Sequence, residues 1–245
     1  MATADSFDWS SLDRDIIAEM IGFASPTIVK KSISPTEFSK KIRLIFKFFQ
    51  IPVTVKTCYD TKTDKNLIWV GGLYDSIKDK TSRKSITVNL QFHKQSTPVK
   101  ITQGFFRRTC YSIADTIMHE IIHMRQYRRR NYKDIPGYYS TASSGKQRAE
   151  QIYLGHNDEI DSYSFNIACQ LMDRFGTDKR KIVNYLNSNL IDRRRKKDGY
   201  RMYLDAFDHD HAHKVIKKLK KKVVNYLPNA IELGKPYRTS DWLKK

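Results

Sequence analysis

The sequence predicts an α+β fold, with helices and a small mixed β-sheet in its N-terminal half and a mainly helical C-terminal part. Two observations support this prediction. Residues 34–50 carry apolar side chains at helical spacing. They are followed by three short β-like runs, "IPVTVKTCYD", "NLIWVGGLYD" and "SITVNLQFH". Helical periodicity returns after about residue 105, so the sheet is expected to end before that point.

The N-terminal segment predicts two helices. The first is indicated by "SLDRDIIAEMIGFA". In the second, Ser34 can cap the helix, Pro35 suits its first position and Glu37 completes a capping box. This helix is expected to pack through an apolar stripe that includes Phe38.

The last β-like run shows the clearest alternation. Ile86, Val88, Leu90 and Phe92 fall on one face, and the residues between them are polar. The sequence therefore predicts a small sheet with one solvated face.

Beyond the sheet, residues 105–130 predict a helix, residues 131–148 a loop, and the segment from Asp158 another helix that ends at Gly176. We expect residues 1–176 to form one domain. Residues 177–245 contain 19 Lys and Arg against 8 Asp and Glu, a net charge of +11 out of +19 for the chain. They predict a basic, mainly helical lobe packed beside that domain.

Composition limits the environment of the protein. The charge of +19 over 245 residues and a pI of about 9.8 favour anionic partners, either nucleic acid or an acidic protein surface. The three cysteines form no CxxC pair, which indicates buried thiols in a reducing compartment. The start of the chain lacks the features of a signal peptide, and no apolar run is long enough to span a membrane. We expect a cytoplasmic protein with no membrane partner.

The stretch "TIMHEIIHMRQYRRR" contains an HExxH motif. His119 and His123 are four residues apart, so on a helix both imidazoles lie on one face and can bind one metal ion. Glu120 is rotated by about 100° and can reach a water on that metal without ligating it. The alternative is an ordinary helix whose two histidines face solvent or make hydrogen bonds in the core.

The motif and its uncharged neighbours Thr116, Ile117 and Met118 resemble the zincin class of zinc peptidases. Arg125 departs from the apolar preference of the extended pattern, and no histidine follows at metzincin spacing. The resemblance is to the gluzincin branch and implies a zincin-like fold. It also implies that a glutamate on the next helix is the third ligand. Glu159 fits that role, and His156 is the competing ligand.

The segment "YLGHNDEIDSYSFNIACQL" also resembles metallopeptidase-like proteins of tailed phages. This resemblance implies Glu159 as a ligand and a phage-encoded protein. Tyr163 stands where thermolysin-like enzymes often have an aspartate that orients the first histidine. Asp115 and Asp161 are the alternatives for that role.

A zinc peptidase mechanism follows from these residues. Two imidazoles and a carboxylate favour Zn²⁺, which would lower the pKa of a bound water to about 7. Glu120 would act as the general base that takes the proton of this water. The donor to the oxyanion stays open among the downstream tyrosines and histidines, which are Tyr200, Tyr203, His209, His211 and His213.

The histidines in "DAFDHDHAHKVIKK" allow a second metal site if they lie on a strand, but a helix start capped by Asp208 or Asp210 is the favoured prediction. The basic runs at 193–197 and 214–224 have two readings as well. They predict either contacts to phosphates or a solvated face.

The function expected from the sequence is a zinc-dependent peptidase acting on proteins or peptides. One alternative is a virion or assembly protein that keeps the metal site without turnover. Another is a nucleic-acid-associated protein similar to SprT-like enzymes, in which His156 would replace Glu159 as third ligand.

Overall fold

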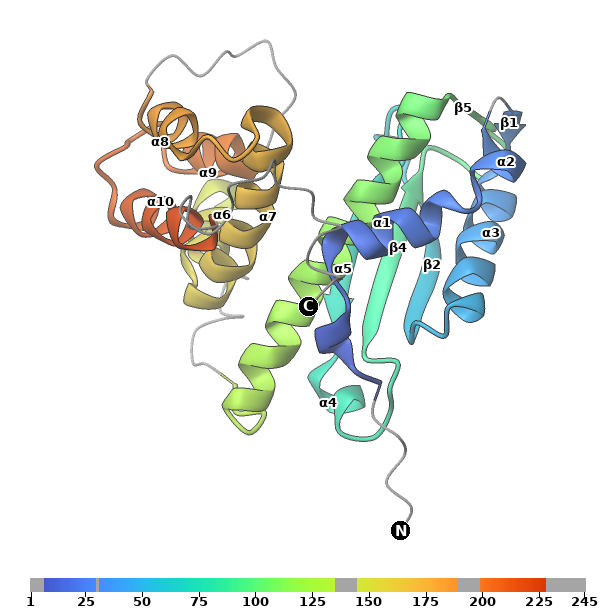
Figure 1. Cartoon of the computed structure of the whole chain (residues 1–245), viewed down its shortest axis with the longest axis horizontal. Coiled ribbons are helices and arrows are strands. Elements are labelled where there is room, and N and C mark those ends of the chain that lie inside the picture. Colours follow the sequence, from blue (N-terminus) through green and yellow to red (C-terminus); the bar gives the residue numbers. More distant parts are fainter. Residues whose placement is uncertain (1–6, 30, 135–144, 189–198, 228–245) are drawn as a thin grey trace. The chain divides into compact units, whose positions relative to one another are not determined.

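The computed structural model of the chain describes residues 7–29, 31–134, 145–188 and 199–227. By their internal contacts the residues form two units, Met1–Arg128 and Arg129–Lys245. Figure 1 labels most helices and strands of the two units. Each unit is described by itself below.

A three-stranded mixed sheet lies at the centre of the first unit. It consists of β2 (Val53–Tyr59), β4 (Ile86–Phe92) and β3 (Trp69–Tyr74), in the order β2-β4-β3. β2 runs parallel to β4, and β3 runs antiparallel to it. The three strands confirm the three predicted runs and the mixed α+β class, and they place β3 at an edge of the sheet.

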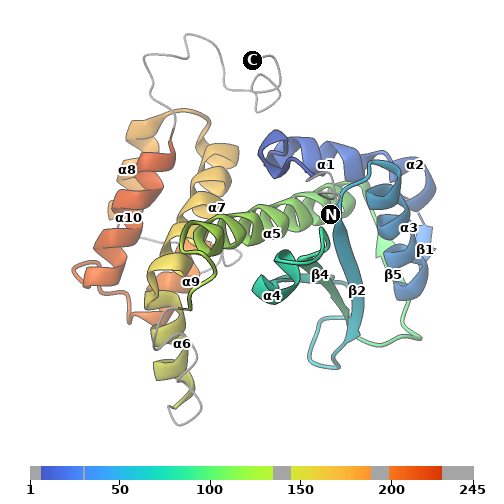
Figure 2. The same ribbon diagram turned by 90° about the horizontal axis from the view of Figure 1, so that it is seen from below.

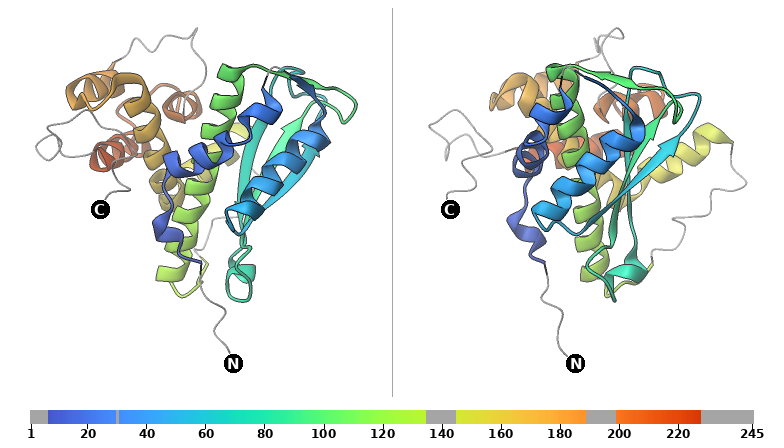
Figure 3. Two further views of the ribbon diagram at one scale, coloured as in Figure 1. Left: turned by 45° about the vertical axis from the view of Figure 1, so that its right-hand side comes forward. Right: turned by 90° about the vertical axis from the view of Figure 1, so that its right-hand side faces the viewer.

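Helices α3 (Pro35–Phe48) and α5 (Gln103–Arg129) cover the apolar face of this sheet, an arrangement that can be followed in Figure 3. The ring of Phe38 on α3 lies 6.1 Å from that of Phe92 on β4 and 6.4 Å from that of Phe106 on α5. The other face of β4 carries the polar side chains of Thr87, Asn89 and Gln91. The predicted alternation of apolar and polar side chains is confirmed, but this face is not fully solvated as predicted, because Thr87 is buried and Asn89 and Gln91 are half-buried.

The caps of the N-terminal helices follow from local sequence. The hydroxyl of Ser34 accepts a hydrogen bond from the backbone N–H of Glu37 at 3.2 Å, as predicted for the start of α3. Helix α1 (Arg14–Gly22) begins after Asp13, whose carboxylate accepts from the N–H of Ile16 at 2.8 Å. Both helices therefore start where a side chain satisfies a free backbone donor.

Several short elements of the first unit were not predicted, because three or four residues are too few to show a period. Strands β1 (Lys31–Ile33) and β5 (Val99–Ile101) form a separate antiparallel pair. The other short elements are η1 (Trp9–Ser11), α2 (Ser25–Ile28) and α4 (Ser76–Asp79).

The second unit is helical in its described part. It contains α6 (Lys146–Gly155), α7 (Asn157–Phe175), α8 (Lys179–Asn187), α9 (Gly199–Ala206) and α10 (Lys214–Tyr226). Helix α10 lies along α7, as Figure 2 shows. Side chains from all five helices share one apolar core. The sequence predicted a domain boundary at residue 176, whereas α6 and α7 share their core with the helices beyond it and belong to the unit that begins at Arg129.

Two helix ends of this unit test the sequence predictions. Helix α7 ends before Gly176, which has a φ of 65°, so the predicted stop is confirmed. The predicted cap of α10 by Asp208 or Asp210 is wrong, because the N-cap is His213, whose ring nitrogen accepts from the N–H of Val215. Asp210 instead accepts from the N–H of Ala212, in a turn that precedes the helix.

The state of the cysteines and the apolar character of the helices can be compared with the expectations drawn from composition. Cys58, Cys110 and Cys169 are free thiols, and burial raises the pKa of Cys110 to about 12. Within the described ranges, no helix combines the length and the apolar character needed to cross a bilayer. The basic run at 193–197 lies outside the described residues.

Phe38 and Phe48 on α3 offer a matched test of the core. Phe38 is 0% exposed and Phe48 is 79% exposed. We expect Phe38→Ala to lower the free energy of unfolding by about 3–5 kcal/mol, because it leaves a cavity between α3, α5 and β4. Phe48→Ala should change it by less than about 0.5 kcal/mol. Urea unfolding followed by circular dichroism measures both, and equal losses would contradict this account of the core.

Candidate metal centre

The two motif histidines lie one turn apart on α5 and point the same way. The Nε2 atoms of His119 and His123 are 3.0 Å apart, and the ring centroids are separated by 4.7 Å. Both side chains are buried, at 7% exposure. The prediction that both imidazoles share one face of a helix is confirmed.

Gln126 holds the ring of His123 in a defined state. Its side-chain Oε1 lies 3.0 Å from His123 Nδ1. A carbonyl oxygen can only accept, so this contact favours the neutral tautomer with the proton on Nδ1 and the lone pair on Nε2. An outer partner of this kind fixes the tautomer and orientation of a metal-binding histidine. The sequence analysis missed this residue, although its position three after His123 on a helix places it within reach.

The geometry of the pair suits a metal ion. A zinc–nitrogen bond is about 2.0–2.1 Å long, so one ion can reach two nitrogens that are 3.0 Å apart. The same separation also suits a hydrogen bond between the two rings. Two buried imidazole nitrogens at this distance form a donor set that fits a metal ion.

Glu120 lies against strand β3. A Cβ atom added to Gly72 would come within 2.4 Å of Glu120 Oε1 and 2.7 Å of the Thr116 methyl group. No side chain other than hydrogen fits between the strand and the helix at this point. The carboxylate that sequence analysis assigned as general base is therefore held beside the edge strand of the sheet.

A network around Asp79 fastens this edge of the sheet to α5. Arg128, near the end of α5, donates from Nε and Nη2 to the Asp79 carboxylate, both at 2.7 Å. The Tyr74 hydroxyl on β3 and the Ser85 hydroxyl donate to the same carboxylate at 3.0 and 3.1 Å. Bidentate pairs of arginine and carboxylate are among the stronger polar contacts. The network was not predicted, because Asp79 and Arg128 are 49 residues apart in the sequence.

Asp115 ties α5 to α1. Its carboxylate accepts from Arg14 Nε at 2.5 Å, and the Arg14 guanidinium lies 4.6 Å from the centre of the Tyr111 ring. The carboxylate is in a largely buried ion pair one turn before His119. The sequence proposed Asp115 as a residue that orients His119, and that role stays a prediction.

Glu159 belongs to the second unit, in the first turn of α7. Its side chain is 1% exposed. The neighbouring Asp158 forms an ion pair with Arg130 at 2.8 Å. A carboxylate in the first turn is favoured by the helix dipole, which explains why this turn holds two acidic residues.

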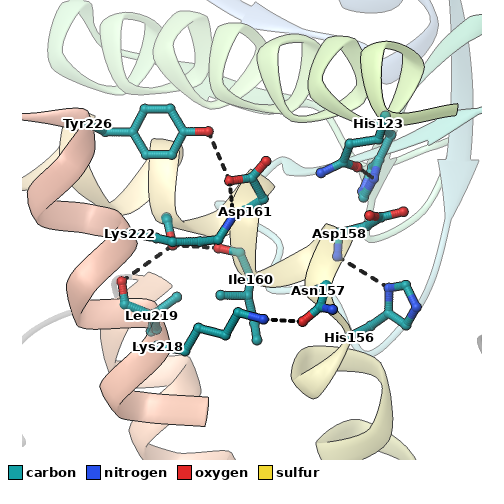
Figure 4. Close-up of polar contacts among 12 residues, drawn as sticks. His123, His156, Asn157, Asp158, Ile160, Asp161, Lys218, Leu219, Lys222 and Tyr226 are labelled. Carbon is teal, nitrogen blue, oxygen red and sulfur yellow. Dashed lines mark hydrogen bonds and ion pairs between the residues drawn. The ribbon is translucent and has the colours of Figure 1, made fainter. Parts of the chain in front are cut away.

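Figure 4 shows the contacts of two further predicted site residues, His156 as the competing ligand and Asp161 as a residue that could orient His119. His156 is the N-cap of α7, and its Nδ1 accepts from the N–H of Asp158 at 3.3 Å. Asp161 accepts from Lys222 Nζ at 2.5 Å and from the Tyr226 hydroxyl at 3.2 Å. Both residues thus have structural contacts within the second unit.

The residues predicted as possible oxyanion donors lie in different environments of the second unit. Tyr200 and Tyr203 are fully buried in the core of the second unit, and the Tyr200 hydroxyl donates to the carbonyl of Leu186 at 2.6 Å. Tyrosines in this position are poorly placed to reach a substrate.

The three alternating histidines have three different partners. His209 pairs with Asp205 at 3.1 Å, and His213 caps α10. His211 lies 3.0 Å from Lys220 Nζ, and burial together with this cation lowers the pKa of His211. Among the described residues, the potential metal-binding groups do not include these histidines, so the structure gives no support to the second metal site.

Comparison with known proteins gives no family for the chain. No family model matches it, and neither a curated protein nor a solved structure is significantly similar to it. Function is therefore inferred from the residues and their geometry.

Gly72 provides a test of the contact between β3 and Glu120. Gly72→Ala should lower the free energy of unfolding by about 1–3 kcal/mol, because the new methyl group overlaps Thr116 and Glu120. Gly22→Ala is the matched control, since a Cβ at Gly22 meets nothing within 4 Å. Thermal unfolding of both variants measures the difference. A Gly72→Ala variant as stable as the control would mean that strand and helix are not in close contact.

Proposed function

We propose that this protein is a zinc-dependent peptidase with a zincin-like active site. The observation that carries the proposal is the buried pair of imidazoles with convergent Nε2 atoms, beside a glutamate held against an edge strand. A helix that serves only to pack in the core has no need of two buried, convergent imidazoles next to a buried glutamate. The HExxH motif supplies two histidine ligands and a glutamate base, and the third ligand has to come from elsewhere in the chain.

His119, His123 and Glu159 are the proposed ligands. All three side chains are buried, and each can offer one ligand atom to a metal ion. A divalent metal ion bound here would add a favourable charge beside the buried carboxylate of Glu159. His156 is less suited as the third ligand, because its Nδ1 already caps α7.

Glu120 is the proposed general base. A zinc ion held by His119, His123 and Glu159 would act as a Lewis acid toward a carbonyl and would lower the pKa of water to about 7. Glu120 accepts the proton of the attacking water and passes it to the leaving amine. Its carboxylate lies against the backbone of β3 at Gly72, where no side chain separates strand and helix.

The edge strand supports an extended peptide as the substrate. β3 pairs with β4 on one side, and no strand of the described residues pairs with its other side. An extended peptide can add to such an edge through main-chain hydrogen bonds. Trp69 and Leu73 on β3 are 57% and 55% exposed, so apolar side chains are available beside the backbone of a bound peptide.

The proposal includes a phage-encoded origin, which rests on the sequence resemblance of the segment around Glu159 alone. The alternative of a virion or assembly protein that binds metal without turnover shares the same three ligands. It differs at one residue, because only a peptidase needs the carboxylate of Glu120.

Metal content is the first test. The purified protein should contain about one zinc per chain by elemental mass spectrometry, and His123→Ala and Glu159→Ala should each lose it. His209→Ala and Glu150→Ala are matched controls, because both residues are exposed and lie outside the proposed ligand set. A protein that takes up no zinc even when zinc is supplied is not a zinc peptidase. Zinc retained by Glu159→Ala and lost by His156→Ala would assign the third ligand to His156.

Turnover is tested with Glu120→Gln. This change removes the base and keeps the size of the side chain, so cleavage of casein or of a mixed peptide library should fall by about 10²–10⁴-fold. The zinc content should stay the same, because Glu120 is not a ligand. Cleavage at the unmutated rate would instead favour the non-catalytic metal protein, with the activity coming from a contaminant.

A further inference from the structure

Helix α10 buries one side in the core of the second unit. Val215, Ile216, Leu219 and Val223 are buried there, and α10 packs along α7. At about 100° per residue these four side chains cover one side of the helix. The apolar side of α10 is therefore fully used by folding.

The lysines that flank this apolar side are engaged within the unit. Lys218 donates to the side chain of Asn157, and Lys222 donates to Asp161 at 2.5 Å (Figure 4). Lys220 donates to Asn187 at 3.2 Å and lies 3.0 Å from His211. The contacts of Lys218 and Lys222 fasten α10 to α7, and those of Lys220 fasten it to α8 and to the turn before α10.

Three other lysines form a separate stripe. Lys214, Lys217 and Lys221 are exposed, and none of them has an ionic partner among the described residues. On a helix they fall within an arc of about 60°, opposite the apolar side. From Lys214 to Lys221 the three side chains span about 10 Å along the axis of α10. We call these three residues the lysine stripe.

The composition of the lysine stripe decides between classes of anionic partner. A helix that lies on a membrane inserts apolar side chains into it, and the apolar side of α10 is buried in the core. A protein interface is depleted in lysine and has an apolar centre, which the stripe lacks. Phosphate contacts need only cations presented at regular intervals along an accessible surface.

We propose that the lysine stripe of α10 binds the phosphate backbone of nucleic acid. Contacts to phosphates carry no base information, so the binding has no sequence preference. The net charge of +19 draws the polyanion toward the chain from a distance. This activity is independent of the metal centre and of the proposed peptidase function.

Fluorescence anisotropy with a labelled duplex of about 20 base pairs, between about 50 and 200 mM salt, tests the proposal. The full chain is compared with the triple variant K214Q/K217Q/K221Q and with a control of equal charge, K40Q/K62Q/K94Q. The control lysines are exposed residues of the first unit. The logarithm of the DNA-binding constant falls linearly with the logarithm of the salt concentration. The stripe variant should make this fall less steep by about 2.7, since each phosphate contact contributes about 0.9 to the magnitude of the slope. The control should leave the slope within about 0.5 of the unmutated value.

Several results would overturn the proposal. One is the absence of DNA binding by the unmutated chain, and another is an equal loss in both triple variants, which would assign binding to net charge alone. A third is binding to phosphatidylserine vesicles that the stripe variant loses while DNA binding stays unchanged. If circular dichroism shows that the triple variant is unfolded, the single variant K217Q replaces it, with an expected fall in slope of about 0.9.

Discussion

The close approach of strand β3 to helix α5 at Gly72 is the contact on which the candidate centre depends. Glycine lets the strand backbone lie against Thr116 and Glu120 with no side chain between them. The Asp79 network then holds the strand and the end of α5 together. Glu120 keeps its place because both elements are fixed, whereas a glutamate on an isolated helix would move through several rotamers.

The geometry of the histidine pair depends on helix α5 alone. The distance between His119 and His123 follows from one helical turn, and Gln126 on the next turn orients the second ring. One helix therefore supplies two proposed ligands and a residue that positions one of them. The proposed third ligand, Glu159, comes from another helix and another unit. The histidine pair is thus encoded locally within one helix, whereas the assignment of Glu159 rests on the sequence resemblance.

The same division explains how much the sequence could predict. Ser34, the alternation of Ile86 to Phe92, and the spacing of the two histidines are local signals, and each one is confirmed. The pairing of β1 with β5 and the Asp79–Arg128 ion pair join residues far apart in the sequence, so no local period reveals them. The cap of α10 was misplaced because Asp208 and Asp210 are good capping residues in general, yet the turn they form ends before the helix starts. The paired glycines in "WVGGLY" were the available signal for the contact with α5, since glycine inside a strand often marks a close approach.

The order of the strands has a consequence for the path of folding. β3 and β4 are neighbours in sequence and pair antiparallel, with only α4 between them. β2 pairs in parallel with β4, and β3 and α4 lie between these two strands in the sequence. The sequence separation of the β2–β4 pair is therefore larger than that of the β3–β4 pair. Contacts of short sequence separation form at lower entropic cost. We therefore expect the β3–β4 hairpin to form early, which would make the strand that faces Glu120 part of the folding nucleus of this unit.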